Sequence, residues 1–448
     1  MSPLWEADEL AAAVGAAGPG FAVNGVSIDT RTLQPGNLFV ALEGERDGHD
    51  FVAEALAKGA AGALVSRDMP GRVLRVEDTL AGLNRLGAAS RARTRAKIIA
   101  VTGSVGKTTT KEMLRTCLGA FGTVHAAEAS FNNHIGVPLT LARMRRGVDF
   151  GVFEIGMNHP GEILPLARLV RPDVAVITCV DRAHLGLMGS EAAIAAEKAS
   201  VFAGLSLGGT AVLPGDSKFL ALLRSKVPAG ARQLVFGVDA GDAHFLKVKS
   251  SAETSDISAQ IAGTTVKFRL AAPGLHMAVN AMAVLAVASA LRLDVAAAAA
   301  ALEEFLPFAG RGARRNIPVP GGKVLLLDES YNASGASMRA ALAVLALAPG
   351  RHVAVLGDML ELGEAAEAEH LALLPDVLAA ADQIFTCGVW TKSLFDSLPQ
   401  SKQGAHASDA AALAPLVQAA LRAGDTVLVK GSLGSRMRDV ISLLERPA

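Results

Sequence analysis

Short apolar runs alternate with helical patterns along most of the chain, as expected for parallel β-sheets covered by helices. In the middle section these runs are IIAV, FGVFEIG, VAVIT, TAVLP and LVFG, and a β-rich insertion follows at about 243–271. A second series begins after residue 312 and comprises KVLLLDES, HVAVLGDM, QIFTCG and TVLVKGS. The pattern therefore predicts two α/β units, the second of them a doubly wound, Rossmann-like domain.

A smaller α/β unit is predicted before residue 97. Its candidate strands lie in NGVSIDT, NLFVAL and AGALVS, and the helical pattern FVAEALAKG precedes the third of them. A helix over residues 79–95 closes this unit, and the turn-rich text LPFAGRG at 306–312 separates the two later units. We therefore expect an α/β protein of three domains, at residues 1–96, 97–311 and 312–448, with a mostly parallel central sheet.

The stretch VTGSVGKTTT, residues 101–110, has the composition of a phosphate-binding loop between a strand and a helix. In that setting backbone amides and the helix N-terminus face an anion, Lys107 reaches the outer phosphates and Thr108 ligates Mg²⁺. Because Val101 occupies the first glycine position of G-x-x-x-x-G-K-[ST], an ordinary glycine-rich turn remains the alternative. The candidate nucleotide-binding residues are Thr102, Gly103, Ser104, Val105, Gly106, Lys107, Thr108 and Thr109.

Polar residues follow the central strands, at the edge where α/β sheets bind ligands. Glu154 ends one strand, and its carboxylate is a candidate Mg²⁺ ligand. His184 lies in the loop after another strand, where an ordinary surface histidine is an equal alternative. Lys198 falls in the helical text EAAIAAEKASVF, and a lone helical lysine is usually solvated. Further along, His276 and Asn280 share one helix face.

Two polar loops offer further binding groups. The hydroxyl of Thr30 and the guanidinium of Arg31 could hold a phosphate or a uracil-ribose group, although a capped turn is the commoner interpretation of such a pair. Asn132 and Asn133, in the loop FNNHIGVP, offer amide contacts, but paired asparagines are also typical of turns.

The strands predicted in the third unit also end in polar residues, namely Asp328, Asp358 and Lys430. Three arginines stand at its entry, where they form either a solvated linker or a contact with a phosphate across the domain gap. These arginines are Arg311, Arg314 and Arg315.

Composition narrows the classes of partner. Positive and negative side chains balance to a net charge of +0, so nothing indicates a surface for nucleic acid. The three cysteines lack C-x-x-C spacing and are expected to be core residues in a reducing compartment. The N-terminal text has early acidic residues and does not resemble a secretory signal, and no segment resembles a membrane span. We therefore expect a cytoplasmic monomer that acts on small molecules.

Taken together, these residues resemble the Mur ligases, the ATP-dependent amide-forming enzymes of peptidoglycan synthesis. The family's phosphate loop is T-G-[ST]-x-G-K-T, which residues 102–108 spell as TGSVGKT, and the similarity covers nearly the whole chain. The resemblance implies that the three domains bind the UDP-sugar-peptide, ATP and the incoming amino acid, respectively. It also places Thr108, Glu154, His184 and Lys198 at two Mg²⁺ ions, with Lys198 carbamylated, and makes Lys107, His184 and Lys198 catalytic.

Several segments are most similar to the family member that joins D-alanyl-D-alanine to UDP-N-acetylmuramoyl-tripeptide. DESYNASGASM and LGDMLELG discriminate best, and FNNHIGVPLTL, FEIGMNHPGEI and VKGSLGSRM support them. Met277 and the text at 312–315 depart from the usual family pattern. Residue by residue, the similarity implies that Asn280 contacts adenine, Arg311 the phosphates and Asp328 the ribose region. Thr30 and Arg31 would contact UDP, and Asn132 and Asn133 the sugar-peptide. The residues that would contact substrate where the third domain closes are Tyr331, Asn332, Asp358 and Lys430.

The implied reaction activates the terminal carboxylate of the tripeptide as an acyl phosphate, which the dipeptide amine then attacks. A related ligase adding diaminopimelate or lysine, or glutamate to folate, would share the phosphate loop and Lys198 but should lack the two discriminating segments. A P-loop kinase would need no third domain, and a non-catalytic nucleotide-binding scaffold leaves the joint occurrence of Glu154, His184 and Lys198 unexplained.

Overall fold

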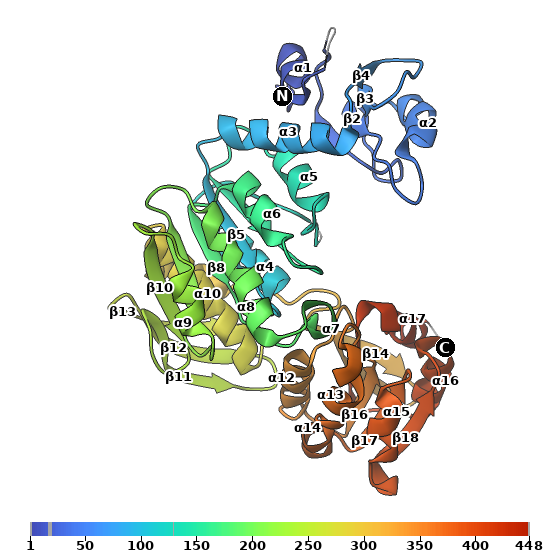
Figure 1. Cartoon of the computed structure of the whole chain (residues 1–448). Helices are drawn as coiled ribbons and strands as arrows, with labels where there is room; N and C mark the ends of the chain where they lie inside the picture. The colour runs from blue at the N-terminus through green and yellow to red at the C-terminus, as the bar shows by residue number, and fades with distance from the viewer. Residues whose placement is uncertain (1, 17–19, 129, 447–448) are drawn as a thin grey trace.

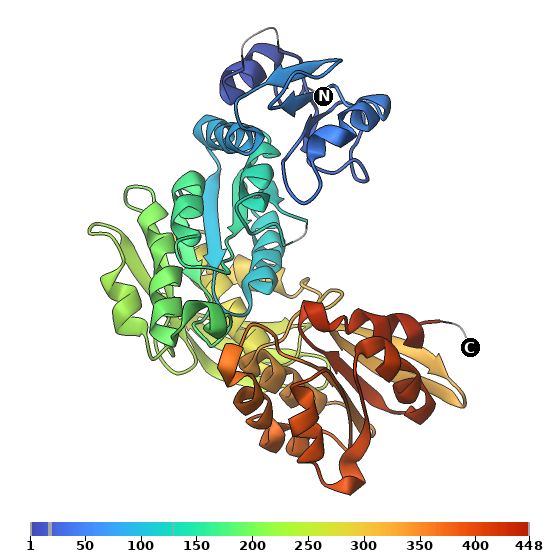
Figure 2. The same ribbon diagram turned by 45° about the vertical axis from the view of Figure 1, so that its right-hand side comes forward.

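Three separate β-sheets organise the chain, as Figures 1 and 2 show from two directions. The computed structural model describes residues 2–16, 20–128 and 130–446. The N-terminal sheet lies at one end and the C-terminal sheet at the other, with the largest sheet between them. The α/β architecture expected from the alternating pattern is confirmed.

The N-terminal sheet has four parallel strands in the order β1-β2-β3-β4. Three of them fall in the expected apolar runs, and the short fourth strand was not expected. The strands are β1 Gly25–Ser27, β2 Asn37–Val40, β3 Gly62–Val65 and β4 Val73–Arg75. The helices here are α1 Ala7–Val14, α2 Val52–Ala57 and α3 Thr79–Arg93, with the 3₁₀ turn η1 Gly48–Phe51 before α2.

The N-terminal unit packs closely on the central one through helix α5, Gly136–Ala142. Leu139 and Ala142 of this helix belong to the hydrophobic core of the first unit, and Trp5 Nε1 donates a hydrogen bond of 3.0 Å to the Ala142 carbonyl oxygen. Burial of a large aromatic ring against a neighbouring helix contributes substantial apolar contact area. The two units therefore share part of a core.

The central sheet has nine strands in the order β13-β12-β11-β10-β9-β8-β5-β7-β6. Its strands are parallel from β6 to β11, and the expected β-rich insertion forms the antiparallel end at β12 and β13. Their bounds are β5 Lys97–Thr102, β6 Val124–Ala126, β7 Phe150–Glu154, β8 Val174–Ile177, β9 Thr210–Pro214, β10 Arg232–Gly237, β11 Ala243–Ser250, β12 Ser255–Ile261 and β13 Thr264–Leu270.

Helices cover both faces of this sheet because successive residues of a strand point to opposite sides. Along β5, Ile99 and Val101 enter one buried cluster with helices α4, α10 and α11, whereas Ile98 and Ala100 enter the other with α5, α6 and α8. Figure 1 shows α6, α8 and α9 on the viewer's side of the sheet. The bounds are α4 Lys107–Gly119, α6 Ile163–Val170, α7 Leu185–Met188, α8 Glu191–Ala199, α9 Leu220–Ser225, α10 Leu275–Ala290 and α11 Val295–Leu302, with the 3₁₀ turn η2 Ser200–Gly204.

The C-terminal sheet has six strands in the order β14-β15-β19-β16-β17-β18, with helices on both faces as expected for a doubly wound domain. The strands are β14 Ala313–Val319, β15 Gly322–Glu329, β16 His352–Gly357, β17 Gln383–Cys387, β18 Gln403–Ala407 and β19 Thr426–Lys430. The helices are α12 Gly335–Leu345, α13 Ala366–Leu371, α14 Leu374–Ala380, α15 Thr391–Asp396, α16 Ala410–Ala420 and α17 Arg438–Leu444, with the 3₁₀ turns η3 Gly363–Ala365, η4 Gln400–Lys402 and η5 Leu433–Ser435.

Strand β14 corrects the interpretation of the arginine-rich entry as a solvated linker. It pairs antiparallel with β15, so that Arg314 faces Leu327 and Arg315 faces Leu326 across the ladder. Ile317 supplies the buried side chain that fixes this strand on the domain. The prolines and charges hid the strand because an edge strand tolerates both. Strand β18, QGAHA, was also missed since it contains no β-branched residue.

No helix among the described residues is long and apolar enough to cross a bilayer. The alanine-rich stretch that begins at Val295 is the short helix α11, and its Ala298, Ala299 and Leu302 are buried in the central core.

Candidate active site

The predicted phosphate-binding loop lies between β5 and α4, which confirms the expected order of strand, loop and helix. Gly103 and Gly106 adopt φ values of 148° and 84°, which favour glycine. Space is equally restrictive: a Cβ at Gly103 would lie 1.9 Å from Thr178 Oγ1, and one at Gly106 would lie 2.6 Å from Asn280 Oδ1. The second contact places Asn280 of α10 directly against the loop, where sequence spacing alone had left its neighbours open.

Residues that follow strand β8 hold the loop in shape. Thr178 Oγ1 donates a hydrogen bond of 2.5 Å to the carbonyl oxygen of Val105, and Ser104 Oγ donates one of 2.9 Å to the carbonyl oxygen of Asp181. Val105 N lies 3.3 Å from Cys179 Sγ. This cysteine therefore contacts the loop, whereas the sequence predicted only a core residue. Neither Thr178 nor Cys179 was expected in the site from the sequence, although their position at a strand end was the available signal.

Lys107 begins helix α4 and points back along the loop. Its Nζ donates hydrogen bonds of 2.7 Å to the carbonyl oxygen of Gly103 and 3.3 Å to that of Ser104. Burial lowers the pKa of this ammonium, while the nearby Glu154 carboxylate acts in the opposite direction. The cation is therefore held at the loop by dipoles, in the place where a phosphate would meet it.

Thr108 and Glu154 are in direct contact. The Thr108 hydroxyl donates a hydrogen bond of 2.8 Å to Glu154 Oε2, and it lies 3.2 Å from the Ser130 hydroxyl. Asn132 Nδ2 donates to the other carboxylate oxygen, Oε1, at 2.7 Å. Asn133 behaves differently, because its Oδ1 accepts from the amide of Gly136 and so serves turn chemistry.

Oxygen donors of this kind suit a hard cation. Among residues 2–16, 20–128 and 130–446, no group of three or more His, Cys, Asp or Glu side chains could by itself hold a metal ion. Mg²⁺ is usually held by one or two protein carboxylates or hydroxyls together with phosphate oxygens. Thr108, Glu154 and Ser130 therefore fit an ion that arrives with a nucleotide.

Lys198 is buried, which overturns the expectation that a lone helical lysine is solvated. Its side chain lies in α8 with a relative exposure of 1% for the whole residue. Burial lowers the pKa of this amine to about 7, and repulsion from Lys107 contributes in the same direction. A large fraction of Lys198 is therefore uncharged near neutral pH.

His184 contacts the C-terminal domain. Its Nδ1 lies 2.5 Å from Oε2 of Glu361, which belongs to the segment LGDMLELG. The same interface contains an ion pair between Arg182 and Glu369, and Arg182 Nε also meets Glu191 Oε1 at 2.6 Å. Glu361 was not among the residues expected in the site, although the segment LGDMLELG that carries it discriminates best among the family members.

A second group of charges lies where the chain passes from the central to the C-terminal domain. Arg311 stacks over the ring of Tyr331 at 4.2 Å, and Lys430 Nζ donates to the carbonyl oxygen of Asn332 at 2.9 Å. Burial raises the pKa of Glu329, against the opposing effect of Lys430 at 3.6 Å. The structure thus brings together Arg311, Tyr331, Asn332 and Lys430, four of the predicted site residues.

Asp328 and the N-terminal pair are already engaged within their own domains. Asp328 accepts hydrogen bonds from Arg315 at 3.0 Å and from the Ser330 hydroxyl at 2.7 Å. Arg31 forms a two-point contact with the Asp29 carboxylate, at 2.6 and 2.9 Å, and its side chain is 86% exposed. Thr30 offers its carbonyl oxygen to Lys58 Nζ at 3.1 Å. The Arg31 amide also donates a hydrogen bond of 2.9 Å to Asp29 Oδ1, so the pair stands in a turn capped by a side chain, and its contact with UDP stays a prediction.

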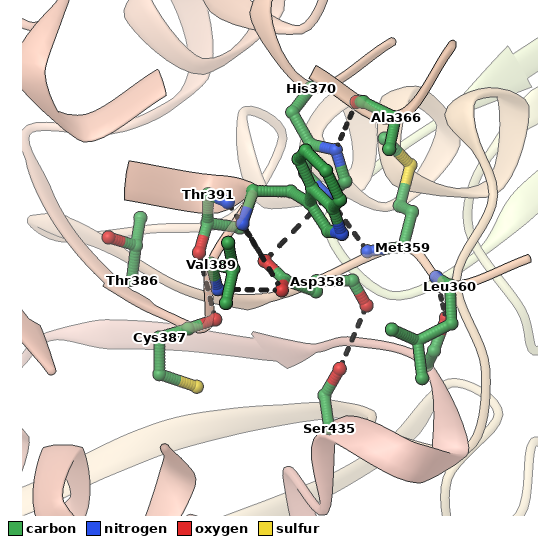
Figure 3. A network of polar contacts seen from close by, with 12 residues as sticks. Asp358, Met359, Leu360, Ala366, His370, Thr386, Cys387, Val389, Thr391 and Ser435 are labelled. Atoms are coloured by element: carbon green, nitrogen blue, oxygen red, sulfur yellow. Dashed lines mark hydrogen bonds and ion pairs between the residues drawn. The ribbon is translucent and has the colours of Figure 1, made fainter. Parts of the chain in front are cut away.

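Asp358 anchors a loop of the C-terminal domain (Figure 3). Its carboxylate accepts hydrogen bonds from the backbone amides of Val389, Trp390 and Thr391, at 2.9, 3.2 and 2.8 Å, at the start of helix α15. Its exposed fraction is 6%, so both oxygens are committed within the domain. This geometry gives Asp358 a structural function at the predicted substrate region.

Replacing Asp358 by alanine is expected to destabilise the C-terminal domain by about 1–3 kcal/mol, because buried amides lose their acceptor. The measurement is urea unfolding followed by tryptophan fluorescence in a Trp5→Phe background, so that the signal comes from Trp390 at the affected helix. Asp396→Ala is the matched control, since Asp396 ends the same helix with its side chain 57% exposed. Equal stability of the two variants would contradict the capping function.

Three family models match the chain. They are described as "Mur ligase family, catalytic domain" for residues 22–112, "Mur ligase middle domain" for 101–288, and "Mur ligase, glutamate ligase domain" for 315–433. The UDP-N-acetylmuramoyl-tripeptide–D-alanyl-D-alanine ligase of Escherichia coli (strain K12) is 36% identical over 440 residues, covering 96% of this chain and 95% of the relative.

Solved structures extend the comparison to the fold. A crystal structure of MurF from Acinetobacter baumannii superposes with a TM-score of 0.88 at 30% identity and covers 99% of both chains. The MurF ligase of Thermotoga maritima in complex with ADP gives 0.78 at 27% identity, over 94% of this chain and 97% of that one. Because family models, full-length sequence similarity and fold agree, this chain belongs to the Mur ligase family.

Proposed function

We propose that the chain catalyses the ATP-dependent joining of D-alanyl-D-alanine to UDP-N-acetylmuramoyl-tripeptide, with release of ADP and phosphate, as its relatives' names describe. The observation that carries this proposal is the phosphate-binding loop with Lys107, placed in one site with the contacting pair Thr108 and Glu154. The two substrates join through an amide bond, which requires an activated carboxylate. ATP supplies that activation.

In the first step, the terminal carboxylate of the tripeptide attacks the γ-phosphate of ATP and ADP leaves, giving an acyl phosphate. Negative charge develops on the transferring phosphoryl oxygens. We propose that Lys107 and the amides at the N-terminus of α4 stabilise that charge, since the ammonium lies at the loop beside those amides. Asn132 fixes the orientation of the Glu154 carboxylate through Oε1.

In the second step, the amine of the dipeptide attacks the acyl carbonyl, and the tetrahedral intermediate expels phosphate while the nitrogen loses a proton. Mg²⁺, when bound, would supply positive charge beside the phosphate oxygens. We propose Thr108 and Glu154 as its protein ligands and His184 with Lys198 as ligands of a second ion. Asn280, which packs on Gly106, is proposed to contact the adenine.

The environment of Lys198 supports the proposed carbamate. An uncharged lysine amine adds to CO₂, giving R–NH–COO⁻ and one proton. A pKa of about 7 keeps much of this amine uncharged at neutral pH, because burial and Lys107 both disfavour the ammonium. The product is a carboxylate-like oxygen ligand, which is the type that Mg²⁺ prefers. Lys107 would also stabilise its negative charge.

A cavity in the C-terminal domain is proposed to receive the dipeptide. It has a volume of about 480 Å³ and opens at the carboxyl ends of β16, β17 and β18. Its lining combines apolar Leu360 and Val389 with two charged residues. Arg436 is paired with Asp439 at 3.0 Å, and the Asp409 carboxylate accepts a hydrogen bond from the amide of Ala412 at 2.9 Å. D-alanyl-D-alanine carries two methyl groups, one ammonium and one carboxylate, which match those surfaces. Asp358 contributes to the cavity by shaping its wall.

Phosphate release should require all three substrates together. With ATP and Mg²⁺ present, we expect release only when both UDP-N-acetylmuramoyl-tripeptide and D-alanyl-D-alanine are added, and near-background release when either is omitted. The assay follows inorganic phosphate and, in parallel, the UDP-linked pentapeptide product by mass spectrometry. Turnover that persists without the dipeptide would identify a kinase or hydrolase.

The same assay separates the related ligases. Lysine, diaminopimelate or glutamate offered with their corresponding acceptors should give no product if the dipeptide is the amine substrate.

We further propose that the enzyme acts as a monomer in the cytoplasm, where ATP and UDP-linked precursors are available. Size-exclusion chromatography with light scattering measures the oligomeric state.

A further inference from the structure

The loop after strand β16 reaches across to the central domain. Its residue Glu361 accepts a hydrogen bond of 3.1 Å on its carbonyl oxygen from the amide of Gly186, which belongs to helix α7. A Cβ at Gly186 would lie 2.7 Å from the amide nitrogen of Gly363, so the two backbones touch. Figure 1 shows α7 beside the C-terminal domain. This is a close contact between two domains at the edge of the proposed active site.

Two residues in this contact adopt an unusual backbone conformation. His184 and Glu361 both have a φ of 65°, in the left-handed region that residues other than glycine rarely occupy. Nδ1 of His184 lies 2.5 Å from Oε2 of Glu361, which makes an ion-pair contact whose geometry is not that of an aligned hydrogen bond. Such conformations persist where the surrounding structure enforces them, and they are concentrated at functional positions.

The Glu361 loop is fixed from within its own domain (Figure 3). The backbone amide of Met359 donates to Nε2 of His370 at 2.9 Å, and Nδ1 of His370 lies 2.6 Å from the carbonyl oxygen of Ala366. The amide of Leu360 donates to the Ser432 hydroxyl at 2.9 Å. These bonds immediately precede Glu361, so its carboxylate is presented from a rigid support.

We propose that Glu361 is a positioning residue that orients His184 across the domain interface. A negative carboxylate oxygen this close to Nδ1 favours the tautomer in which Nδ1 carries the proton, which leaves the Nε2 lone pair free to ligate a metal or accept a hydrogen bond. The contact exists only when the C-terminal domain is docked, so docking completes the orientation of His184. The catalytic consequence of this inference rests on the proposed function. The tautomer of His184 can be measured whether or not that function is correct.

The test uses the full chain labelled with ¹⁵N-histidine, without substrates. In the wild-type protein, nitrogen NMR should report protonated Nδ1 and unprotonated Nε2 for His184, assigned by comparison with His184→Gln. Glu361→Ala should lose this preference, and Glu361→Gln should keep part of it because its amide oxygen still accepts a hydrogen bond. In the ligase assay we expect kcat to fall about 10- to 100-fold for the alanine variant and less for glutamine.

Two controls separate positioning from simple docking. Arg182→Ala removes another contact of the same interface, with Glu369, and should leave the His184 tautomer unchanged. Glu364→Gln changes an exposed carboxylate three residues away and should match the wild type in every measurement. An unchanged tautomer in Glu361→Ala, or an equal change in Arg182→Ala, would overturn the proposal. Absence of ligase activity in the wild type would instead count against the proposed function alone.

Discussion

Replacing Lys198 by alanine is expected to lower ligase turnover by about a hundredfold to a thousandfold, the range seen when a single stabilising group is lost from a reaction centre. The lysine is buried, and its lowered pKa of about 7 leaves much of its amine uncharged near neutral pH. Alanine has no amine and therefore cannot form the proposed carbamate. Formate or acetate added to the variant should restore part of the activity, because a small carboxylate can occupy the vacated position. The measurement is product formation with and without the added acid.

Lys226→Ala serves as the control for this experiment, since Lys226 is an exposed lysine of the same domain. It should retain wild-type turnover and show no response to formate or acetate. Wild-type protein incubated with ¹³C-bicarbonate should give a carbamate carbon signal that Lys198→Ala lacks. Because the neutral amine is the reacting form, this signal should increase as the pH rises through about 7. Full activity of Lys198→Ala without added acid would refute the carbamate.

Lys107→Met is expected to lower kcat by about a thousandfold while the protein stays folded. Methionine fills a similar volume and removes a half-buried charge, whose desolvation already lowers the pKa of Lys107. The loss should appear in the transfer step, because the ammonium is proposed to stabilise the phosphoryl oxygens more strongly as charge develops on them. Turnover under saturating ATP and both co-substrates is the measurement, with ADP affinity by calorimetry as a second readout.

Lys97→Ala is the matched control, since Lys97 begins the same strand β5 that ends at the phosphate-binding loop, and its side chain is 61% exposed. This variant should keep kcat within about twofold of the wild type, as expected for an exposed charge. If Lys107→Met bound ADP more weakly but turned over normally at saturation, Lys107 would serve binding alone.

Local patterns were sufficient to predict the three α/β units and the phosphate-binding loop. Strand β5, the loop and α4 follow from a β-branched run, a glycine-containing turn and a helical apolar face, all within a few residues of one another. Edge strands were harder to predict, since β14 contains arginines and a proline and β18 has no β-branched residue. Pairing stabilises both: β14 forms a tight hairpin with β15, so its partner is close in the sequence, whereas β18 pairs with β17 about twenty residues earlier.

The sequence by itself determined the alternation of strands and helices, the Lys107 loop and the polar residues at strand ends, because these depend on side-chain periodicity and short-range turn chemistry. Only the tertiary structure decided which of those residues meet. It buried Lys198 near Lys107, placed Asn280 against Gly106, and brought Glu361 to His184 from another domain. Such contacts join residues far apart in the chain, and their geometry depends on how complete sheets and helices pack.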